Sequence, residues 1–373
     1  MHDVFKDKYC TDCKANLSNT LSANKLNLLV DLVCRPHHTE TSRLLLQVHD
    51  AVLTTPGLLA RVLNHLGCIK AIARCSTVNK CWQAASQQVQ LRSIVLAPAN
   101  GLTLAEAECF LEVYKKRKAQ AQGTFSQLRH IDICITKIPA EDVQTDMVRG
   151  DSLIQSLLTI LTIPVHKDIN TSMLTSCQLS GNFQLKSMAQ SLPVSLQHLV
   201  LEPDHRNCKQ RAFNLSMFGK FVHLQTLHID IWYHLLGVDG DPRRYILDVA
   251  LPSLETLYLL HDGHFLQSPD FTLAACLPSL RHVGANVDVD CAQALLNLPK
   301  LEFAALRLTK NPNGNVAHLT VNKRSNLNWL VLDKSNLAQT TVMLDKAGVI
   351  IEFMNLEVDF AKSLFPFNFD PVI

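Results

Sequence analysis

Leucine residues recur in a fixed pattern along the second half of the chain. From residue 195 onward, the pattern Leu-x-x-Leu-x-Leu returns six times, and its fourth and fifth copies are degenerate. Apolar residues alternate with other residues at the end of each copy, which is typical of a short half-buried strand. The first leucines of the six copies are Leu196, Leu224, Leu254, Leu280, Leu301 and Leu327. The pattern therefore predicts a series of similar strands.

The spacing of these copies predicts how the strands are connected. Successive copies are 28, 30, 26, 21 and 26 residues apart, close to the roughly 20–29 residues of a leucine-rich repeat. Weaker copies begin at Leu91, Leu128 and Leu174, and residues 349–353 have the pattern of a last strand. Residues 291–298 and 336–348 are helix-compatible, and the second segment ends at a glycine, a residue typical of the position after a helix.

A single strand-and-helix unit cannot bury its own apolar face, so neighbouring units must stack around a continuous core. We therefore predict an α/β fold, a leucine-rich-repeat solenoid over residues 97–373 that ends in a C-terminal tail. Its parallel strands would lie on the concave face and its helices on the convex face. A closed α/β domain with coincidental strands would not explain the recurring first leucine.

Strand alternation also predicts which side chains face the concave side. These positions combine aromatic residues, histidines and single charges, and aromatic anchors dominate protein interfaces. Those we expect to bind a target protein are His198, His228, Tyr258, His282, Phe303 and Trp329; the same face carries Glu202, Asp230, Arg307 and Asp333. The three histidines lie on separate repeats without regular spacing, so we do not assign them a shared metal ion.

Phe303 and Trp329 have a second interpretation. The C-terminal segment 363–373 is itself rich in phenylalanine and needs an apolar surface on which to dock. The two aromatic residues could pack beneath this tail instead of contacting a target, and the sequence does not decide between the two.

A different pattern precedes the repeats. Between residues 56 and 85 the apolar positions have helical spacing and are interrupted at Gly67, which predicts three short helices. About 35 residues form too small a core to be stable alone. We therefore place a helical module at residues 48–96, after an N-terminal leader at residues 1–47.

This module resembles an F-box. A proline is followed by Leu-Leu-x-x-Val-Leu-x-x-Leu, then by a short apolar helix and by Val-x-x-x-Trp. The positions that match are Pro56, Leu58, Leu59, Val62, Leu66, Val78 and Trp82. The usual Leu-Pro-x-Glu opening is absent, because Thr55 precedes the proline and no glutamate follows it.

An F-box just ahead of leucine-rich repeats resembles the F-box/leucine-rich-repeat proteins. The resemblance implies a substrate-recognition subunit of an SCF ubiquitin ligase, whose F-box binds a Skp-type adaptor and, through it, the cullin and RING subunits. The repeats would bind the protein to be ubiquitylated. The alternative is a non-degradative repeat scaffold whose N-terminal helices cap the solenoid, because such arrays require terminal caps.

Composition excludes several other functions. The 373 residues carry a net charge of +2, and 18% are charged, against about 25% in an average protein. A broad basic surface for nucleic acid is thus not expected, and no apolar stretch is long enough for a membrane span. No hydrolase, metalloprotease, phosphate-loop or dinucleotide-binding motif is present. We predict neither catalytic residues nor a cofactor.

The cysteines indicate the cellular compartment. The twelve cysteines are scattered through periodic segments, and the N-terminal ten residues lack the apolar core of a signal peptide. We expect reduced cysteines in a cytoplasmic or nuclear protein. Two pairs, Cys10 with Cys13 and Cys34 with His37, have spacing compatible with zinc. The segment between them resembles an amphipathic helix instead of a finger hairpin, so they remain zinc candidates only.

Overall fold

The structure is a computed structural model. It describes residues 54–64, 78–89, 92–96, 103, 105, 107–109, 111–112, 128–135, 151–159, 174–181, 183–203, 212–230, 243–259, 264–267, 273–308, 316–335, 340–354 and 356. The chain forms two compact units: a first unit of Met1–Cys134, Ile160–Met173 and Asp370–Ile373, and a second unit of Ile135–Thr159 and Leu174–Phe369. The leader, with the zinc candidates Cys10, Cys13, Cys34 and His37, lies outside the described residues, as does Leu66.

Two helices of the first unit fall within the F-box-like segment. Helix α5 (Pro56–Asn64) begins with a proline, which is favoured in the first turn because its missing N–H needs no partner there. Helix α7 (Lys80–Gln87) begins after Asn79, whose side chain accepts a hydrogen bond from the Trp82 N–H at 3.0 Å. The middle helix predicted from the sequence falls at residues 65–77, outside the described part of the chain.

The first unit also contains two parallel strands, β1 (Ser93–Leu96) and β2 (His130–Cys134). They were predicted from the weak pattern copies at Leu91 and Leu128. The side chains of Ile94 and Ile131, which lie opposite each other in this pair, are both fully buried.

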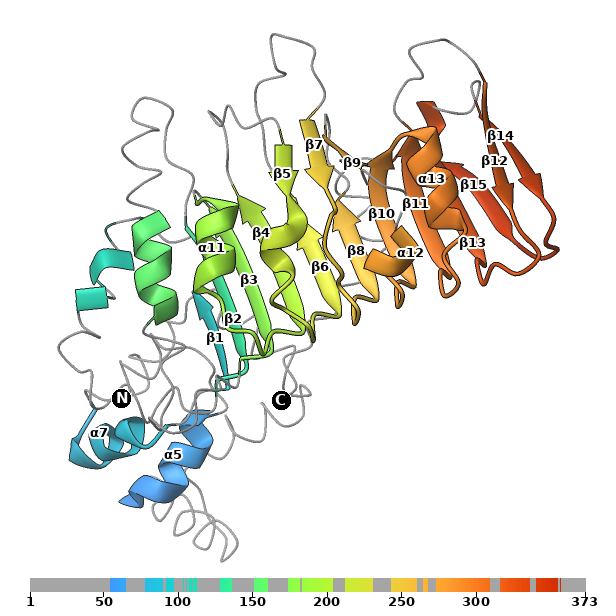
Figure 1. The fold of residues 1–373 in the computed structure, drawn as a ribbon. Helices are drawn as coiled ribbons and strands as arrows, with labels where there is room; N and C mark the ends of the chain where they lie inside the picture. The colour runs from blue at the N-terminus through green and yellow to red at the C-terminus, as the bar shows by residue number, and fades with distance from the viewer. Residues whose placement is uncertain are drawn as a thin grey trace, which may run out of the picture. The chain divides into compact units, whose positions relative to one another are not determined.

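The second unit is built on a long sheet in which every neighbouring pair of described strands is parallel (Figure 1). Its order is β3-β4-β6-β8-β10-β11-β13-β15. The strands are β3 (Ser176–Gly181), β4 (His198–Pro203), β6 (Thr226–Ile229), β8 (Thr256–Leu259), β10 (His282–Val287), β11 (Phe303–Leu308), β13 (Trp329–Asp333) and β15 (Ile350–Met354).

Short helices alternate with these strands. Figure 1 shows α11 (Leu185–Ser191), α12 (Leu273–Cys276) and α13 (Val289–Leu296) on the same side of the sheet. We call the opposite side of the sheet the far face. Other elements of the second unit are the 3₁₀ helix η2 (Leu215–Phe218), the parallel strands β5 (Ala212–Asn214), β7 (Arg243–Ile246) and β9 (His264–Gln267), and the pair β12 (Ala317–Val321) and β14 (Thr340–Leu344). This is an α/β protein with a long parallel sheet, consistent with a leucine-rich-repeat arrangement.

The first leucine of every repeat copy is buried, as predicted. All six have at most 1% of their surface exposed. In three copies a Leu-Pro pair stands before this leucine and forms a tight turn: the Leu254 N–H, for example, donates to the Leu251 carbonyl at 3.1 Å. Proline suits the second position of such a turn because its φ is fixed near the required value. The turn therefore aims each new strand into the shared core.

One backbone hydrogen bond repeats at the start of successive strands. The N–H of Gln225 donates to the Gln197 carbonyl, that of Glu255 to Gln225, and that of Arg281 to Glu255, at 2.7 to 2.8 Å. The series continues through Glu302 and Asn328. Equivalent residues at the start of neighbouring strands are therefore linked directly. These hydrogen bonds fix the register of the sheet.

Three predictions made for the C-terminal part of the chain had different outcomes. The helix predicted at 291–298 is confirmed as α13, and the last strand predicted at 349–353 is confirmed as β15. The helix predicted at 336–348 is wrong, because this segment contains strand β14, which pairs with β12. Thr340, Thr341 and Val342 are branched at Cβ and favour a strand over a helix.

None of the described helices is both long and apolar enough to cross a lipid bilayer.

Candidate functional site

The far face of the second unit is organised in rows of side chains that run across the strands. The strand register places every second residue of one strand beside its equivalent in the next. The first row consists of His198, Thr226, Thr256, His282, Phe303 and Trp329. The second row consists of Val200, His228, Tyr258, Gly284, Ala305 and Val331. All six predicted target-binding residues lie in these two rows.

The two rows differ in exposure. The second row is buried throughout: His228 is 2% exposed and Tyr258 is 0% exposed. In the first row, Phe303 is buried, whereas the histidines, threonines and Trp329 are half-buried. Three of the six predicted residues, His198, His282 and Trp329, thus retain accessible surface, and His228, Tyr258 and Phe303 do not.

A residue that follows the last strand explains part of this burial. Leu356 is 1% exposed and packs in one cluster with Tyr258, Phe303, Ala305 and Val331. Trp329 and Met354 lie against this cluster, and the Phe303 and Trp329 rings meet edge to face with centroids 5.3 Å apart. The two aromatic residues are therefore packed against the chain's own C-terminal region at Leu356. The tail proposed as their partner, residues 363–373, lies outside the described residues.

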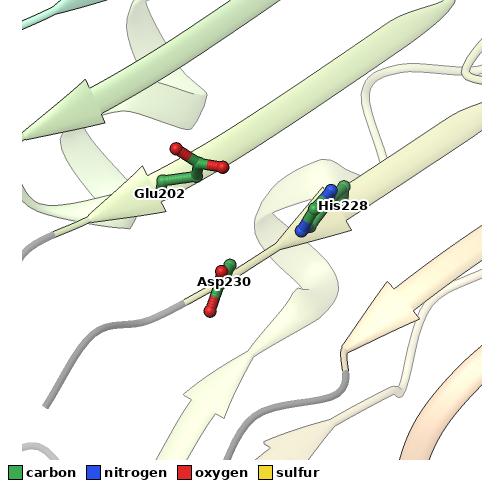
Figure 2. A group of neighbouring side chains, drawn as sticks. All are labelled: Glu202, His228 and Asp230. Carbon is green, nitrogen blue, oxygen red and sulfur yellow. The ribbon is translucent and has the colours of Figure 1, made fainter. Parts of the chain in front are cut away.

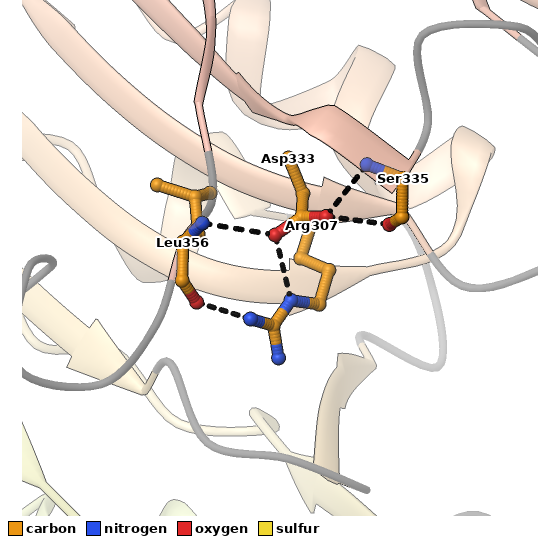
Figure 3. Close-up of polar contacts among 4 residues, drawn as sticks. All are labelled: Arg307, Asp333, Ser335 and Leu356. Carbon is orange, nitrogen blue, oxygen red and sulfur yellow. Dashed lines mark hydrogen bonds and ion pairs between the residues drawn. The ribbon is translucent and has the colours of Figure 1, made fainter.

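Polar contacts hold Leu356 in place at the same time (Figure 3). Its N–H donates to Asp333 Oδ2 at 3.1 Å, and Arg307 Nη2 donates to its carbonyl oxygen. Arg307 Nε also donates to Asp333 Oδ2 at 3.2 Å, and the Ser335 N–H and hydroxyl both donate to Asp333 Oδ1. We call these four residues, Arg307, Asp333, Ser335 and Leu356, the clamp.

The clamp determines the charge state of Asp333. Burial alone would raise the pKa of this carboxyl group. The hydrogen bonds from Ser335 and Leu356 and the positive charge of Arg307 outweigh burial and lower the pKa below its ordinary value. Asp333 is therefore a stable anion at neutral pH, and both of its oxygen atoms are used in the clamp.

The first row is polar from His198 to His282. His198 Nδ1 is hydrogen-bonded to Thr226 Oγ1 at 3.2 Å, and His282 Nδ1 to Thr256 Oγ1 at 3.3 Å. Burial lowers the pKa of both imidazoles, and the nearby charges of Glu255 and, for His282, Glu302 offset this only in part. Both rings are therefore neutral at physiological pH. The row offers hydrogen-bonding groups without a net charge.

The F-box-like segment presents a second surface. Leu59 and Leu63 on α5 are 1% and 2% exposed, and α5 packs against α7. Leu58 and Val62, one helical turn apart, are each 42% exposed, and Val78 is 60% exposed. Pro56 and Trp82 are half-buried. Of the predicted adaptor-binding residues, one is thus a core residue and three are exposed apolar side chains.

Among the described residues, one group of side chains could hold a metal ion: Glu202, His228 and Asp230. Sequence reasoning placed all three on the same face but compared only the histidines with one another. The pairing of β4 with β6 brings a glutamate of one strand beside an aspartate of the next. This pairing would have been needed to predict the group from the sequence.

Comparison with known proteins adds no identification: no protein-family model matches the chain, and no curated protein matches it.

Proposed function

We propose that this protein is a non-catalytic interaction subunit, the substrate-recognition component of an SCF-type ubiquitin ligase. The observation that carries the proposal is the exposed apolar surface formed by Leu58 and Val62 of α5. Solvent-facing leucine and valine one turn apart, on a helix whose other apolar residues are already buried, favour a helix that packs on a partner. These positions belong to the F-box-like pattern.

The same segment also supports the proposal because different apolar side chains form its core and its exposed surface. Leu59 and Leu63 are buried and α5 packs on α7, so the helix pair is held without Leu58, Val62 and Val78. Apolar area removed from water contributes roughly 25 cal/mol per Å². Covering these three side chains with a Skp-type adaptor would therefore supply binding free energy without disturbing the core of the module.

The parallel sheet supplies the target-binding surface in this proposal. We assign recognition to the first row of a leucine-rich-repeat solenoid, where His198, His282 and Trp329 are accessible, and not to the covered second row. Neutral imidazole and threonine groups can satisfy the polar atoms of a peptide, and a tryptophan supplies apolar contact area. The ligase activity would come from proximity alone, because a bound target is held at high effective concentration near the conjugating enzyme.

Binding of a purified Skp-type adaptor tests the proposal. We expect the full-length protein to bind the adaptor in isothermal titration calorimetry and the variant Val62→Asp to lose at least about tenfold in affinity, since a charge would be buried at the interface. Val222→Asp is the matched control, because Val222 is 48% exposed on the second unit and should not affect adaptor binding.

Two results would refute this function. The first is the absence of adaptor binding by the folded wild-type protein at tens of micromolar. The second is equal binding by the Val62→Asp and Val222→Asp variants. The first result would favour the alternative, a repeat scaffold whose N-terminal helices serve only as a cap.

A further inference from the structure

We propose that Glu202, His228 and Asp230 form a binding site for one divalent transition-metal ion on the far face of the second unit. Each of the three residues offers one ligand atom, and these atoms all lie within 4.8 Å of one another. Figure 2 shows Glu202 near the end of one strand, β4, and His228 and Asp230 on and just after the neighbouring strand, β6. The site does not involve the adaptor-binding segment and is independent of the proposed function.

The sheet itself brings the three side chains together. His228 and Asp230 are two residues apart along extended backbone, so both project to the same face. The register pairs Leu201 with Ile229, and the Asp230 N–H donates to the Leu201 carbonyl at 2.9 Å. This pairing places Glu202 beside Asp230.

Contacts outside the three residues orient two of them. Ser180 Oγ donates to Glu202 Oε2 at 2.7 Å. The His228 ring meets the Tyr258 ring edge to face, with centroids 4.3 Å apart. Such outer contacts fix the rotamers of metal ligands in known sites and lower the entropic cost of binding the ion. The Glu202 carboxylate and the His228 ring are therefore each held by a neighbouring side chain before a metal enters.

The three side chains combine two carboxylates with one nitrogen donor. Asp230 is 0% exposed, His228 is 2% exposed and Glu202 is half-buried. Two carboxylates this close repel each other, and a cation shared between them offsets that repulsion. A divalent ion bound by both carboxylates and the imidazole would therefore stabilise this grouping.

The donor atoms define the class of metal. One nitrogen and two carboxylate oxygens, without a thiolate, suit Mn²⁺, Fe²⁺, Co²⁺ or Zn²⁺, whereas Ca²⁺ needs six to eight oxygen ligands. Metal–ligand bonds of about 2.1 Å allow two ligand atoms to be at most about 4.2 Å apart. Side-chain rotations that move the most distant atoms by roughly half an ångström would therefore close the site. Three protein ligands leave a coordination position for water.

The test uses Mn²⁺ and the full-length protein after treatment with a chelator. Mn²⁺ prefers oxygen and imidazole ligands to thiolates, so the twelve cysteines compete little. We expect one bound Mn²⁺ per chain, measured from the loss of the free-ion electron paramagnetic resonance signal. Asp230→Asn and Glu202→Gln should each weaken binding by at least about tenfold. Glu255→Gln, which alters an exposed carboxylate on a neighbouring turn, should bind as the wild type does.

A second measurement guards against a variant that fails to fold. Mn²⁺ should raise the thermal unfolding midpoint of the wild type and of Glu255→Gln, but not that of Glu202→Gln, whose altered side chain is only half-buried. If the wild type binds no Mn²⁺ at millimolar concentration, the two carboxylates are balanced by the protein alone and the proposal is wrong. Equal Mn²⁺ affinity in Glu202→Gln and Glu255→Gln would overturn it as well.

Discussion

The Asp333 carboxylate accepts a hydrogen bond from the Leu356 N–H at 3.1 Å, although 23 residues separate them in the sequence. The same carboxylate oxygen accepts a hydrogen bond from Arg307 Nε on the neighbouring strand. Backbone that follows the last strand is therefore fastened to the far face, where the Leu356 side chain covers apolar residues of the second row. Under the proposed function, a target protein would contact the first row and not the buried Tyr258 region.

Phe303 tests whether this cluster stabilises the fold. The residue is 9% exposed and contacts both Trp329 and the Leu356 cluster. We expect Phe303→Ala to lower the free energy of unfolding by about 3–5 kcal/mol, because truncation removes apolar contacts and leaves a cavity. Chemical denaturation measures this loss. Val222→Ala, at a 48% exposed position, should change stability by less than about 0.5 kcal/mol; a similarly small effect at Phe303 would mean that the cluster does not contribute.

The clamp predicts a specific dependence on pH. Because the folded-state pKa of Asp333 is below its ordinary value of 3.8, the ionised carboxyl contributes stability that is fully present above that value. This contribution is lost as the pH falls through the lowered folded-state pKa. We expect the stability difference between wild type and Asp333→Asn to be constant near neutral pH and to shrink below about pH 4. A difference that persists unchanged in acid would contradict the role of the charge.

The two histidines of the first row predict a loss of stability in a higher pH range than Asp333 does. Burial lowers the folded-state pKa of His198 and His282 from 6.5, so the unfolded chain takes up protons first as the pH falls. Stability should therefore decrease below about pH 6.5 until the pH passes the folded-state pKa. The double variant His198→Gln/His282→Gln should lose less stability than the wild type between neutral pH and about pH 5. Parallel stability curves would exclude this effect.

Cysteine labelling checks the core independently. Burial, together with the charges of Asp288 and Asp290, raises the pKa of Cys291 to about 12. Only the thiolate is nucleophilic, so Cys291 should not react with iodoacetamide in the native protein near pH 8. Cys109 is exposed and should be labelled under the same conditions. Peptide mass spectrometry distinguishes the two sites, and native labelling of Cys291 ahead of Cys109 would contradict its placement in α13.

Two glycine substitutions should have opposite effects on stability. Gly181 has a φ of +134°, and a Cβ atom there would lie 2.9 Å from the Ile135 carbonyl oxygen. We expect Gly181→Ala to cost roughly 1–3 kcal/mol in the free energy of unfolding. Gly57 lies in α5 with its nearest neighbour, Gln88 Oε1, at 4.0 Å, so Gly57→Ala should stabilise the helix by up to about 1 kcal/mol. Thermal unfolding of both variants measures these effects, and equal shifts would argue against backbone strain at Gly181.

The sheet could be predicted from the sequence because each repeat buries the same positions. Leu196 and its five equivalents must all be buried, so their spacing predicts the strands that follow them. The conformational preference of individual residues explains why the helix predicted at residues 336–348 is wrong. Spacing of apolar residues suggested a helix there, but Thr340, Thr341 and Val342 favour the strand that pairs with β12.

The burial of the predicted binding face could not be read from the repeats. Arg307 and Leu356 are 49 residues apart in the sequence, and their contact depends on where the chain turns after β15. Strand alternation placed Tyr258 and Phe303 on the far face but could not indicate what covers them. The metal-capable group shows a related limit, because alternation aligns His228 with Asp230 and only strand pairing adds Glu202.

The hydrogen bonds that link Gln197, Gln225, Glu255 and Arg281 in succession have a consequence for how the sheet comes apart. Each strand along this path is tied to the strand before it and the strand after it, so cooperativity is transmitted from neighbour to neighbour, as in a one-dimensional chain. A destabilising substitution in a central strand such as β8 would divide the sheet into two segments that unfold at different temperatures. A destabilising substitution in the terminal strand β15 would shorten the cooperative unit and leave the remaining strands to unfold together.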